Sequence, residues 1–165
     1  MGHDNLINGE YSEQHDKIHV RDLNFSDDQF LKKIASLVES VFQASTSSLL
    51  FFVPSARVVI SVGAPVAPSL SDLFFGTVFF DNGIIEIQDT LKDRRLRTHP
   101  DILNDPIIRF FYAYPIMTSD DSLLGAICLF DQHSRSIRQD EKNIMSAVAQ
   151  VVAAYIESRT ISNKS

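Results

Sequence analysis

Apolar residues follow a helical period near both ends of the chain. In the first of these segments they fall on one stripe of a helix: Phe30, Ile34, Leu37, Val38, Val41 and Phe42. Ser26, with Gln29 three residues later, fits a capping box, so we expect this helix to begin at Ser26. The last helix is predicted over residues 137–160, where Ser136 and Gln139 fit a second capping box.

The last helix is apolar around most of its circumference. From Ile144 to Ile156 the polar residues are Ser146 and Gln150. A helix that covers one face of a sheet needs an apolar arc of about 100°. We therefore expect this helix to be buried on two sides, against its sheet and against either the first helix or a second copy of the chain.

Short runs of apolar, β-branched and aromatic residues between these helices predict strands. Five strands are expected, at residues 49–53, 57–62, 84–88, 108–117 and 123–130. Pro54, Ser55 and Ala56 separate the first two strands, and residues 118–122 separate the last two, which predicts two hairpins. Pro115 indicates an edge or a bulge near the end of its strand.

The middle of the chain is less periodic. The apolar residues of 69–80 suit a helix or a strand, and we interpret this segment as a short helix. Residues 89–107 are polar and are predicted to form a long loop with one short helix near residues 100–104. The helices lie mainly at the ends of the chain, and two strand connections are hairpins. This order favours an α+β fold with a central antiparallel sheet of five to six strands.

Length and composition narrow the function further. The 165 residues suit a polar tail at 1–21, one domain at 22–160 and a short tail at 161–165. The net charge is −6, and the basic residues are scattered apart from Arg94, Arg95 and Arg97, which argues against nucleic-acid binding. The chain has one cysteine, no apolar run of membrane length and no signal-peptide pattern. We therefore expect a cytoplasmic protein without a metal or other cofactor.

From Gly83 onward, three motifs follow one another at a regular spacing. They are Ile87-Gln88-Asp89-Thr90-Leu91-Lys92-Asp93-Arg94-Arg95-Leu96, Ile108-Arg109-Phe110-Phe111-Tyr112-Ala113-Tyr114-Pro115-Ile116 and Leu124-Gly125-Ala126-Ile127-Cys128-Leu129-Phe130-Asp131. These motifs resemble those of GAF domains, small-ligand sensor and dimerisation modules of bacterial signalling proteins. With the looser fit of the first helix and hairpin, the resemblance covers residues 22–160.

The resemblance implies a GAF-like arrangement and function. The terminal helices would pack on one face of the sheet, and the short helix and long loop would cover a pocket on the other. The domain would be a non-enzymatic module that binds a small molecule, dimerises through residues 26–43 and 137–160, and signals to a separate protein partner. The signature of the cyclic-nucleotide-binding members is missing, so cAMP and cGMP are not expected as ligands.

Two alternatives to the sensor remain open at this point. One is a ligand-free scaffold whose pocket is filled by its own aromatic residues. The other is a small enzyme on the same fold, such as a methionine sulfoxide reductase, but these reductases depend on more than one cysteine. Here Cys128 lies in an apolar strand, where a thiol is typically inert filling.

Eight residues are candidates for the ligand site: Phe74, Phe75, Asp89, Asp93, Arg95, Arg109, Phe110 and Tyr112. Arginine can grip a carboxylate or a phosphate, and small-molecule sites are mostly apolar with a few polar groups. The same residues also admit a structural interpretation. Asp89 and Asp93 would then accept backbone N–H bonds and pair with Arg95 or Arg109, and the aromatic residues would form core.

Two further expectations concern strand faces and the turn before the last helix. Strand alternation places Phe110 and Tyr112 on one face of the sheet and Phe111 on the other. The turn containing Asp131 and Arg135 is predicted to be structural.

Overall fold

The computed structural model describes residues 27–53, 56–81, 83–103 and 108–164. The predicted N-terminal tail at 1–21 and the linking residues Pro54 and Ser55 lie outside the described residues. Among the described residues, no helix combines the length and apolar character that crossing a membrane requires.

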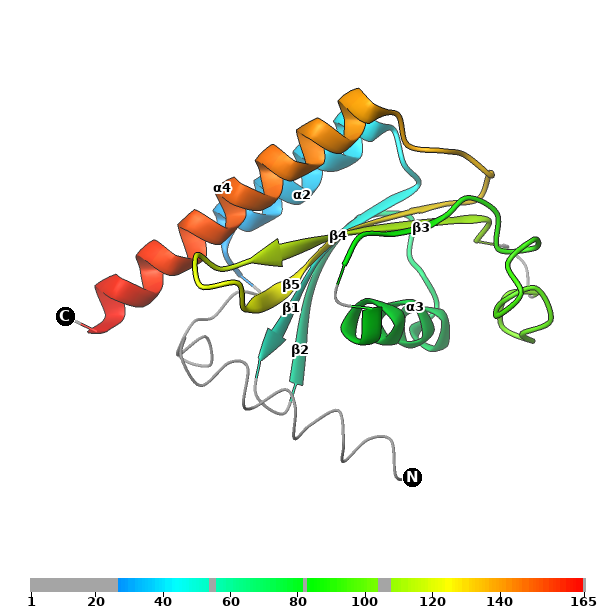
Figure 1. Ribbon diagram of the computed structural model, residues 1–165, viewed down its shortest axis with the longest axis horizontal. Helices are drawn as coiled ribbons and strands as arrows, with labels where there is room; N and C mark the ends of the chain where they lie inside the picture. Colours follow the sequence, from blue (N-terminus) through cyan, green and yellow to red (C-terminus); the bar gives the residue numbers. More distant parts are fainter. Residues whose placement is uncertain (1–26, 54–55, 82, 104–107, 165) are drawn as a thin grey trace.

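A five-stranded antiparallel sheet separates two layers of helices (Figure 1). Its strands are β1 (Thr46–Val53), β2 (Ala56–Gly63), β3 (Ile85–Ile87), β4 (Phe110–Met117) and β5 (Leu123–Asp131), in the order β2-β1-β5-β4-β3. Helices α2 (Gln29–Phe42) and α4 (Gln139–Lys164) lie side by side on one face, and α3 (Pro68–Asp81) lies on the other (Figure 1). The predicted α+β fold and the placement of the terminal helices are therefore confirmed.

Both predicted hairpins are present. Val53 pairs with Ala56 in the first, and Met117 pairs with Leu123 in the second. A register shift lies between Ile116 and Met117, one residue after Pro115, and β3 does not extend to Pro115 on the other side of β4. The bulge or edge that Pro115 indicated is therefore confirmed, because a residue without an N–H cannot continue the ladder on both sides.

The prediction that the first helix begins at Ser26 was wrong. Helix α2 begins at Gln29, and its N-cap is Asp28, whose Oδ1 accepts a hydrogen bond from Leu31 N at 3.0 Å. The other carboxylate oxygen of Asp28 accepts from the Tyr155 hydroxyl at 2.6 Å. This second bond, to α4, adds a tertiary reason for the helix to start here.

The second capping box is displaced by two residues, because Glu141 supplies its carboxylate half to the Arg138 amide in place of Gln139 and Ser136. Helix α4 begins at Gln139, and Glu141 Oε1 accepts from Arg138 N at 3.0 Å. The Ile137 amide donates instead to Glu86 Oε1 of β3 at 2.9 Å. Because a strand residue takes this amide, the chain stays extended past Ser136 before the helix starts.

The short helix predicted near residues 100–104 does not form over 100–103, the part of it that the structure describes. Successive turns occupy this stretch, with Ile102 N donating to His99 O at 3.0 Å and Asp101 N to His99 Nδ1 at 3.2 Å. Leu96 and Ile102 are buried among the residues under α3. The loop is therefore fixed by two apolar anchors instead of a helix.

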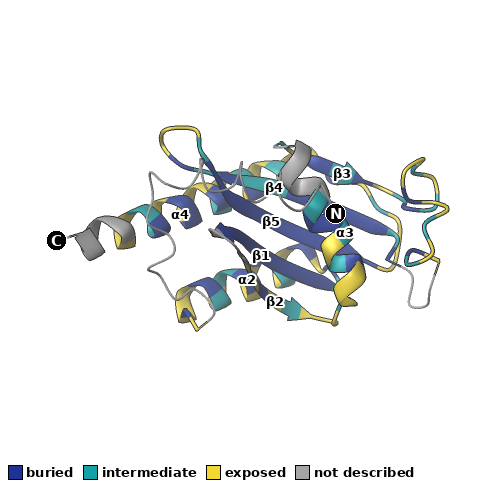
Figure 2. Cartoon of the chain, turned by 90° about the horizontal axis from the view of Figure 1, so that it is seen from below, coloured by how far each residue is buried: buried dark blue, intermediate teal, exposed yellow. Residues whose placement is uncertain are grey.

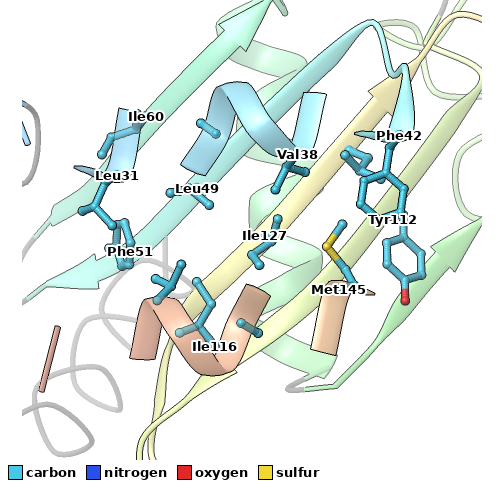
Figure 3. Packing of buried hydrophobic residues seen from close by; sticks show 14 of the residues in the cluster. Leu31, Val38, Phe42, Leu49, Phe51, Ile60, Tyr112, Ile116, Ile127 and Met145 are labelled. Carbon is cyan, nitrogen blue, oxygen red and sulfur yellow. The ribbon is translucent and has the colours of Figure 1, made fainter. Parts of the chain in front are cut away.

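The core consists of two clusters, one on each face of the sheet. The cluster under α2 and α4 joins Leu31 and Val38 of α2, Met145 of α4 and strand residues such as Ile127 (Figure 3). The cluster under α3 joins that helix to the opposite face. All residues of β5 are buried, as expected for a central strand covered on both faces (Figure 2).

Candidate functional site

A cavity of about 470 Å³ lies where the chain leaves β3. It is lined by Glu86, Ile87, Gln88, Asp89, Lys92, Asp93, Ser134, Arg135 and Ser136. The volume falls within the range of about 300–1,000 Å³ that is common for small-molecule sites. One wall is formed by β3 and the start of the long loop, and the other by the segment that leads into α4.

Two hydrogen bonds hold these walls together. Arg135 N donates to the Gln88 carbonyl at 3.2 Å, and Ile137 N donates to Glu86 Oε1 at 2.9 Å. The cavity is thus built directly against the start of α4.

Asp89 is held by Arg109 in a bidentate pair. Arg109 Nε donates to Asp89 Oδ1 at 2.8 Å, and Arg109 Nη2 donates to Oδ2 at 2.6 Å. Leu91 N also donates to Asp89 Oδ1, at 3.0 Å. The hydrogen bond from Arg109 is the main reason that the pKa of Asp89 lies below its ordinary value of 3.8. Both carboxylate oxygens of Asp89 thus have donors from within the protein. This geometry matches the interpretation in which Asp89 pairs with Arg109 to hold the loop.

Asp93 shapes the turn that follows. Its Oδ1 accepts from Arg95 N at 2.9 Å and lies 3.5 Å from Arg95 Nε. Asp93 therefore lines the cavity on one side and fixes the direction of the arginine-bearing loop on the other.

Phe74 and Phe75 of α3 are core residues in this structure. The Phe74 ring lies 4.6 Å from Phe111 and 5.6 Å from Phe130, measured between centroids, and the Phe75 ring lies 6.0 Å from Phe130. Phe74 and Phe75 thus pack against aromatic residues of the sheet, on the face where the resemblance implied a pocket.

Phe110 and Tyr112 face the opposite layer. They belong to the cluster under α2 and α4, whereas Phe111 belongs to the cluster under α3, which confirms the predicted alternation. Of the eight candidates, Asp89 and Asp93 line the cavity, and Arg109 supports one of them from outside it. The structure does not bring the four aromatic candidates to this cavity.

Sequence reasoning missed Glu86 as a site residue, along with the serines of the opposite wall. Glu86 stands opposite Tyr112 in the β3–β4 ladder. The Tyr112 hydroxyl is buried and has no hydrogen-bond partner among the described residues. Burial, with the nearby Glu86 carboxylate, raises the pKa of Tyr112 to about 12. A charged residue inside a short apolar strand was the signal that could have pointed to Glu86.

Arg135, in the cavity wall, links three elements. Its Nη1 donates to the Phe42 carbonyl at the end of α2 at 3.0 Å and lies 3.4 Å from Asp131 at the end of β5. Its Nη2 lies 3.4 Å from Glu141 in the first turn of α4. The structural role predicted for this turn is therefore consistent with the contacts that it makes.

The described residues offer little for nucleophilic or metal chemistry. Cys128 is fully buried, and burial raises the pKa of its thiol. No group of three His, Cys, Asp or Glu side chains among residues 27–164, with their undescribed gaps left out, is placed to hold a metal ion. The polar groups around the cavity can bind and orient a ligand through hydrogen bonds and charge.

Comparison with known proteins settles the family. A model of the GAF domain matches residues 27–156. The chain belongs to the GAF domain family. GAF domains are a sensor and regulatory fold that occurs in signalling proteins.

Relatives of this GAF domain come from varied proteins. It is 27% identical over 93 residues to a cyclic di-GMP phosphodiesterase of Pseudomonas aeruginosa, covering 56% of this chain and 16% of that protein. The chain therefore spans only a small part of that relative.

Solved structures show the same fold at low identity. The GAF domain of an Acinetobacter phosphoenolpyruvate-protein phosphotransferase has a TM-score of 0.61 at 15% identity, over 84% of this chain and 88% of that one. A type II free methionine-R-sulfoxide reductase of Thermoplasma acidophilum has a TM-score of 0.61 at 12% identity, over 78% and 91%. The blue-light absorbing PixJ GAF domain of Thermosynechococcus elongatus has a TM-score of 0.61 at 14% identity, over 81% of this chain and 86% of that one.

Proposed function

We propose that this GAF domain is a non-enzymatic cytoplasmic module that binds a small molecule beside β3 and transmits that binding to its terminal helices. One observation carries the proposal: the cavity wall contains Glu86, whose carboxylate holds the Ile137 amide at 2.9 Å just before α4. A ligand that draws on Glu86 competes for this bond. Binding at the cavity would therefore change how the start of α4 is held.

The far half of α4 is tied to α2, which supports transmission between the helices. The Tyr155 hydroxyl donates to Asp28 at 2.6 Å, and Arg159 Nη1 donates to that hydroxyl at 3.0 Å. The Phe30 and Tyr155 rings lie 4.3 Å apart, between centroids. Since Asp28 also caps α2, a displacement of α4 would weaken that cap.

The same two helices carry the exposed apolar side chains that favour a homodimer. On α2, Leu37 and Val41 are about half exposed, and they are spaced four residues apart. On α4, Ile144 and Val151 are 40% and 50% exposed, seven residues apart. Each pair lies on one stripe of its helix, and a second copy of the chain would cover it. The output would pass from this dimer to a separate signalling protein.

The ligand-free scaffold is the second candidate, and the packing of Phe74 and Phe75 against the sheet favours it. A reductase on this fold receives no support beyond the fold likeness, because the Cys128 thiol is buried and held in its protonated form. The relation to a cyclic di-GMP phosphodiesterase covers 16% of that protein, so its activity is not proposed for this chain.

Native mass spectrometry of the purified chain tests the proposal. We expect a dimer that carries additional small-molecule mass. Leu37→Glu with Val151→Glu should give a monomer, whereas Val59→Glu, an exposed apolar position on β2, should not. A dimer without retained mass, and with the same α4 hydrogen exchange after incubation with a metabolite extract, would support the scaffold instead. A monomer at micromolar concentration would contradict dimerisation through these helices.

A further inference from the structure

The loop after the cavity concentrates positive charge on an acidic protein. Four cationic side chains are exposed there: Lys92, Arg94, Arg95 and Arg97. One acid, Asp93, lies among them, so residues 92–97 carry a formal charge of +3. Since the whole chain carries −6, the remainder carries −9. This segment, which we call the arginine loop, thus differs in sign from the rest of the molecule.

The arginine loop is held in one conformation by a buried leucine and by hydrogen bonds. Leu96, in its middle, is 4% exposed and packs into the cluster under α3. Arg97 N donates to the Asp93 carbonyl at 2.9 Å, and the Asp93 carboxylate receives Arg95 N. The Asp89–Arg109 pair fixes the start of the loop. A preformed loop binds a partner at a lower entropic cost than one that must be ordered.

Much of this charge is not neutralised locally. In the portion of the chain that the structure describes, neither Arg94 nor Arg97 forms an ion pair. Asp93 is engaged with Arg95, and Asp101, further along the loop, faces His99 at 3.9 Å. Two arginine guanidinium groups are therefore available to carboxylates from outside the molecule, and arginine pairs with carboxylates in a bidentate geometry.

We propose that the arginine loop docks an acidic segment of the separate signalling protein. Leu103, six residues after Arg97, is 54% exposed and offers an apolar contact further along the chain. This inference rests on the proposed function, because it takes from it that a separate signalling partner exists. Lys92 and Asp93 also line the cavity, so the docking surface and the ligand site share one loop.

The overall charge favours an acidic protein segment over a nucleic acid. Electrostatic interactions in solution extend over about 8 Å at physiological ionic strength. A short acidic segment can stay within that distance of the arginine loop. An extended phosphate backbone would continue over a surface that carries −9 in total and would be repelled there.

A labelled peptide of sequence Glu-Asp-Glu-Leu-Glu-Asp-Glu tests this docking by fluorescence anisotropy at physiological salt. Arg94→Glu with Arg97→Glu should weaken binding by about tenfold or more, since each exposed pair contributes a few-fold. Lys33→Glu with Lys142→Glu makes the same change in net charge at two residues of the helices that form no ion pair among the described residues, and it should change binding by less than about twofold.

Three results would overturn the inference. They are equal weakening by both double variants, binding of the Gln/Asn version of the peptide as tight as the acidic one, and tighter binding of a DNA duplex than of the peptide. The proposed function is tested separately, because the arginine-loop variant should keep the dimer and any retained small-molecule mass. Loss of peptide binding with an intact dimer supports the docking role, whereas a monomer in both proteins would contradict the proposed function alone.

Discussion

Asp89 and Arg109 join the start of the long loop to the chain just before β4 through two parallel hydrogen bonds. The adjoining backbone reinforces the link, since Thr90 N donates to the Arg109 carbonyl at 2.8 Å. One wall of the cavity and the base of the arginine loop both depend on this connection.

Arg109→Ala should destabilise the domain and loosen the long loop. We expect Tm to fall by roughly 3–6 °C at neutral pH, because the buried Asp89 carboxylate loses its charged hydrogen-bond donor. Arg94→Ala, at an exposed position without an ion pair among the described residues, should change Tm by less than about 1 °C. Differential scanning calorimetry measures both. Equal effects would show that the pair does not anchor the loop.

The stability that this pair provides should disappear in acid. The pKa of Asp89 is lowered in the folded protein, so the unfolded chain binds the proton first as the pH falls. The stabilisation is complete above the ordinary pKa of 3.8 and is lost as the pH drops through the lowered value. The difference in Tm between the native protein and Arg109→Ala should therefore shrink below about pH 4. A constant difference down to the acid limit of folding would contradict this.

Phe74→Ala should cost about 3–5 kcal/mol of unfolding free energy, since it removes a fully buried ring from the cluster under α3. Ile84→Ala, at a residue that is 52% exposed, should cost less than about 0.5 kcal/mol. Urea denaturation gives both values. If Phe74 instead lined an open ligand pocket, its removal would cost far less than a core substitution.

Cys128 should be unreactive in the folded protein. Burial keeps the thiol protonated and closed to reagents. Ellman's reagent should therefore modify it only at the rate of unfolding, and rapidly in urea. Fast modification of the native protein, at a rate close to that of a free thiol, would reopen the reductase alternative.

Tyr112→Phe should leave unfolding free energy at neutral pH within about 0.5 kcal/mol of the native value, or raise it. The change removes a buried hydroxyl that has no partner among the described residues. In alkali, a tyrosine with a pKa of about 12 stays neutral in the folded state while the unfolded chain ionises near pH 10. The unfolding free energy should therefore fall between about pH 10 and pH 12, and it should fall by less in Tyr112→Phe. Tyr114→Phe, at a half-buried residue, serves as the control.

The sequence predicted the fold wherever local chemistry decides the structure. Both hairpins, the break near Pro115 and the alternation of Phe110 and Phe111 follow from turn residues and a period of two. The start of the first helix was misplaced because a tertiary partner adds to one of two possible local caps. Asp28 is chosen over Ser26 with the help of Tyr155, a residue more than a hundred positions away.

The site was harder to predict for the same reason. Asp89 and Asp93 stood out as a charged pair within a structured region, and both line the cavity. Its other wall comes from residues 134–136, which the sheet brings beside β3. No local pattern reports that approach. The structure places the aromatic candidates in the two core clusters. A phenylalanine that fills a core follows the same spacing along the chain as one that lines a pocket.

The position of β1 in the sheet has a consequence for synthesis of the protein. Its inner edge pairs with β5, so that Thr46 meets Phe130, near the end of the domain. While the ribosome is still making the intervening residues, the β1–β2 hairpin presents an apolar strand with unpaired N–H and C=O groups. The nascent chain therefore carries an aggregation-prone edge until β5 emerges. A translation pause before β5 would prolong its exposure to chaperones and to neighbouring chains.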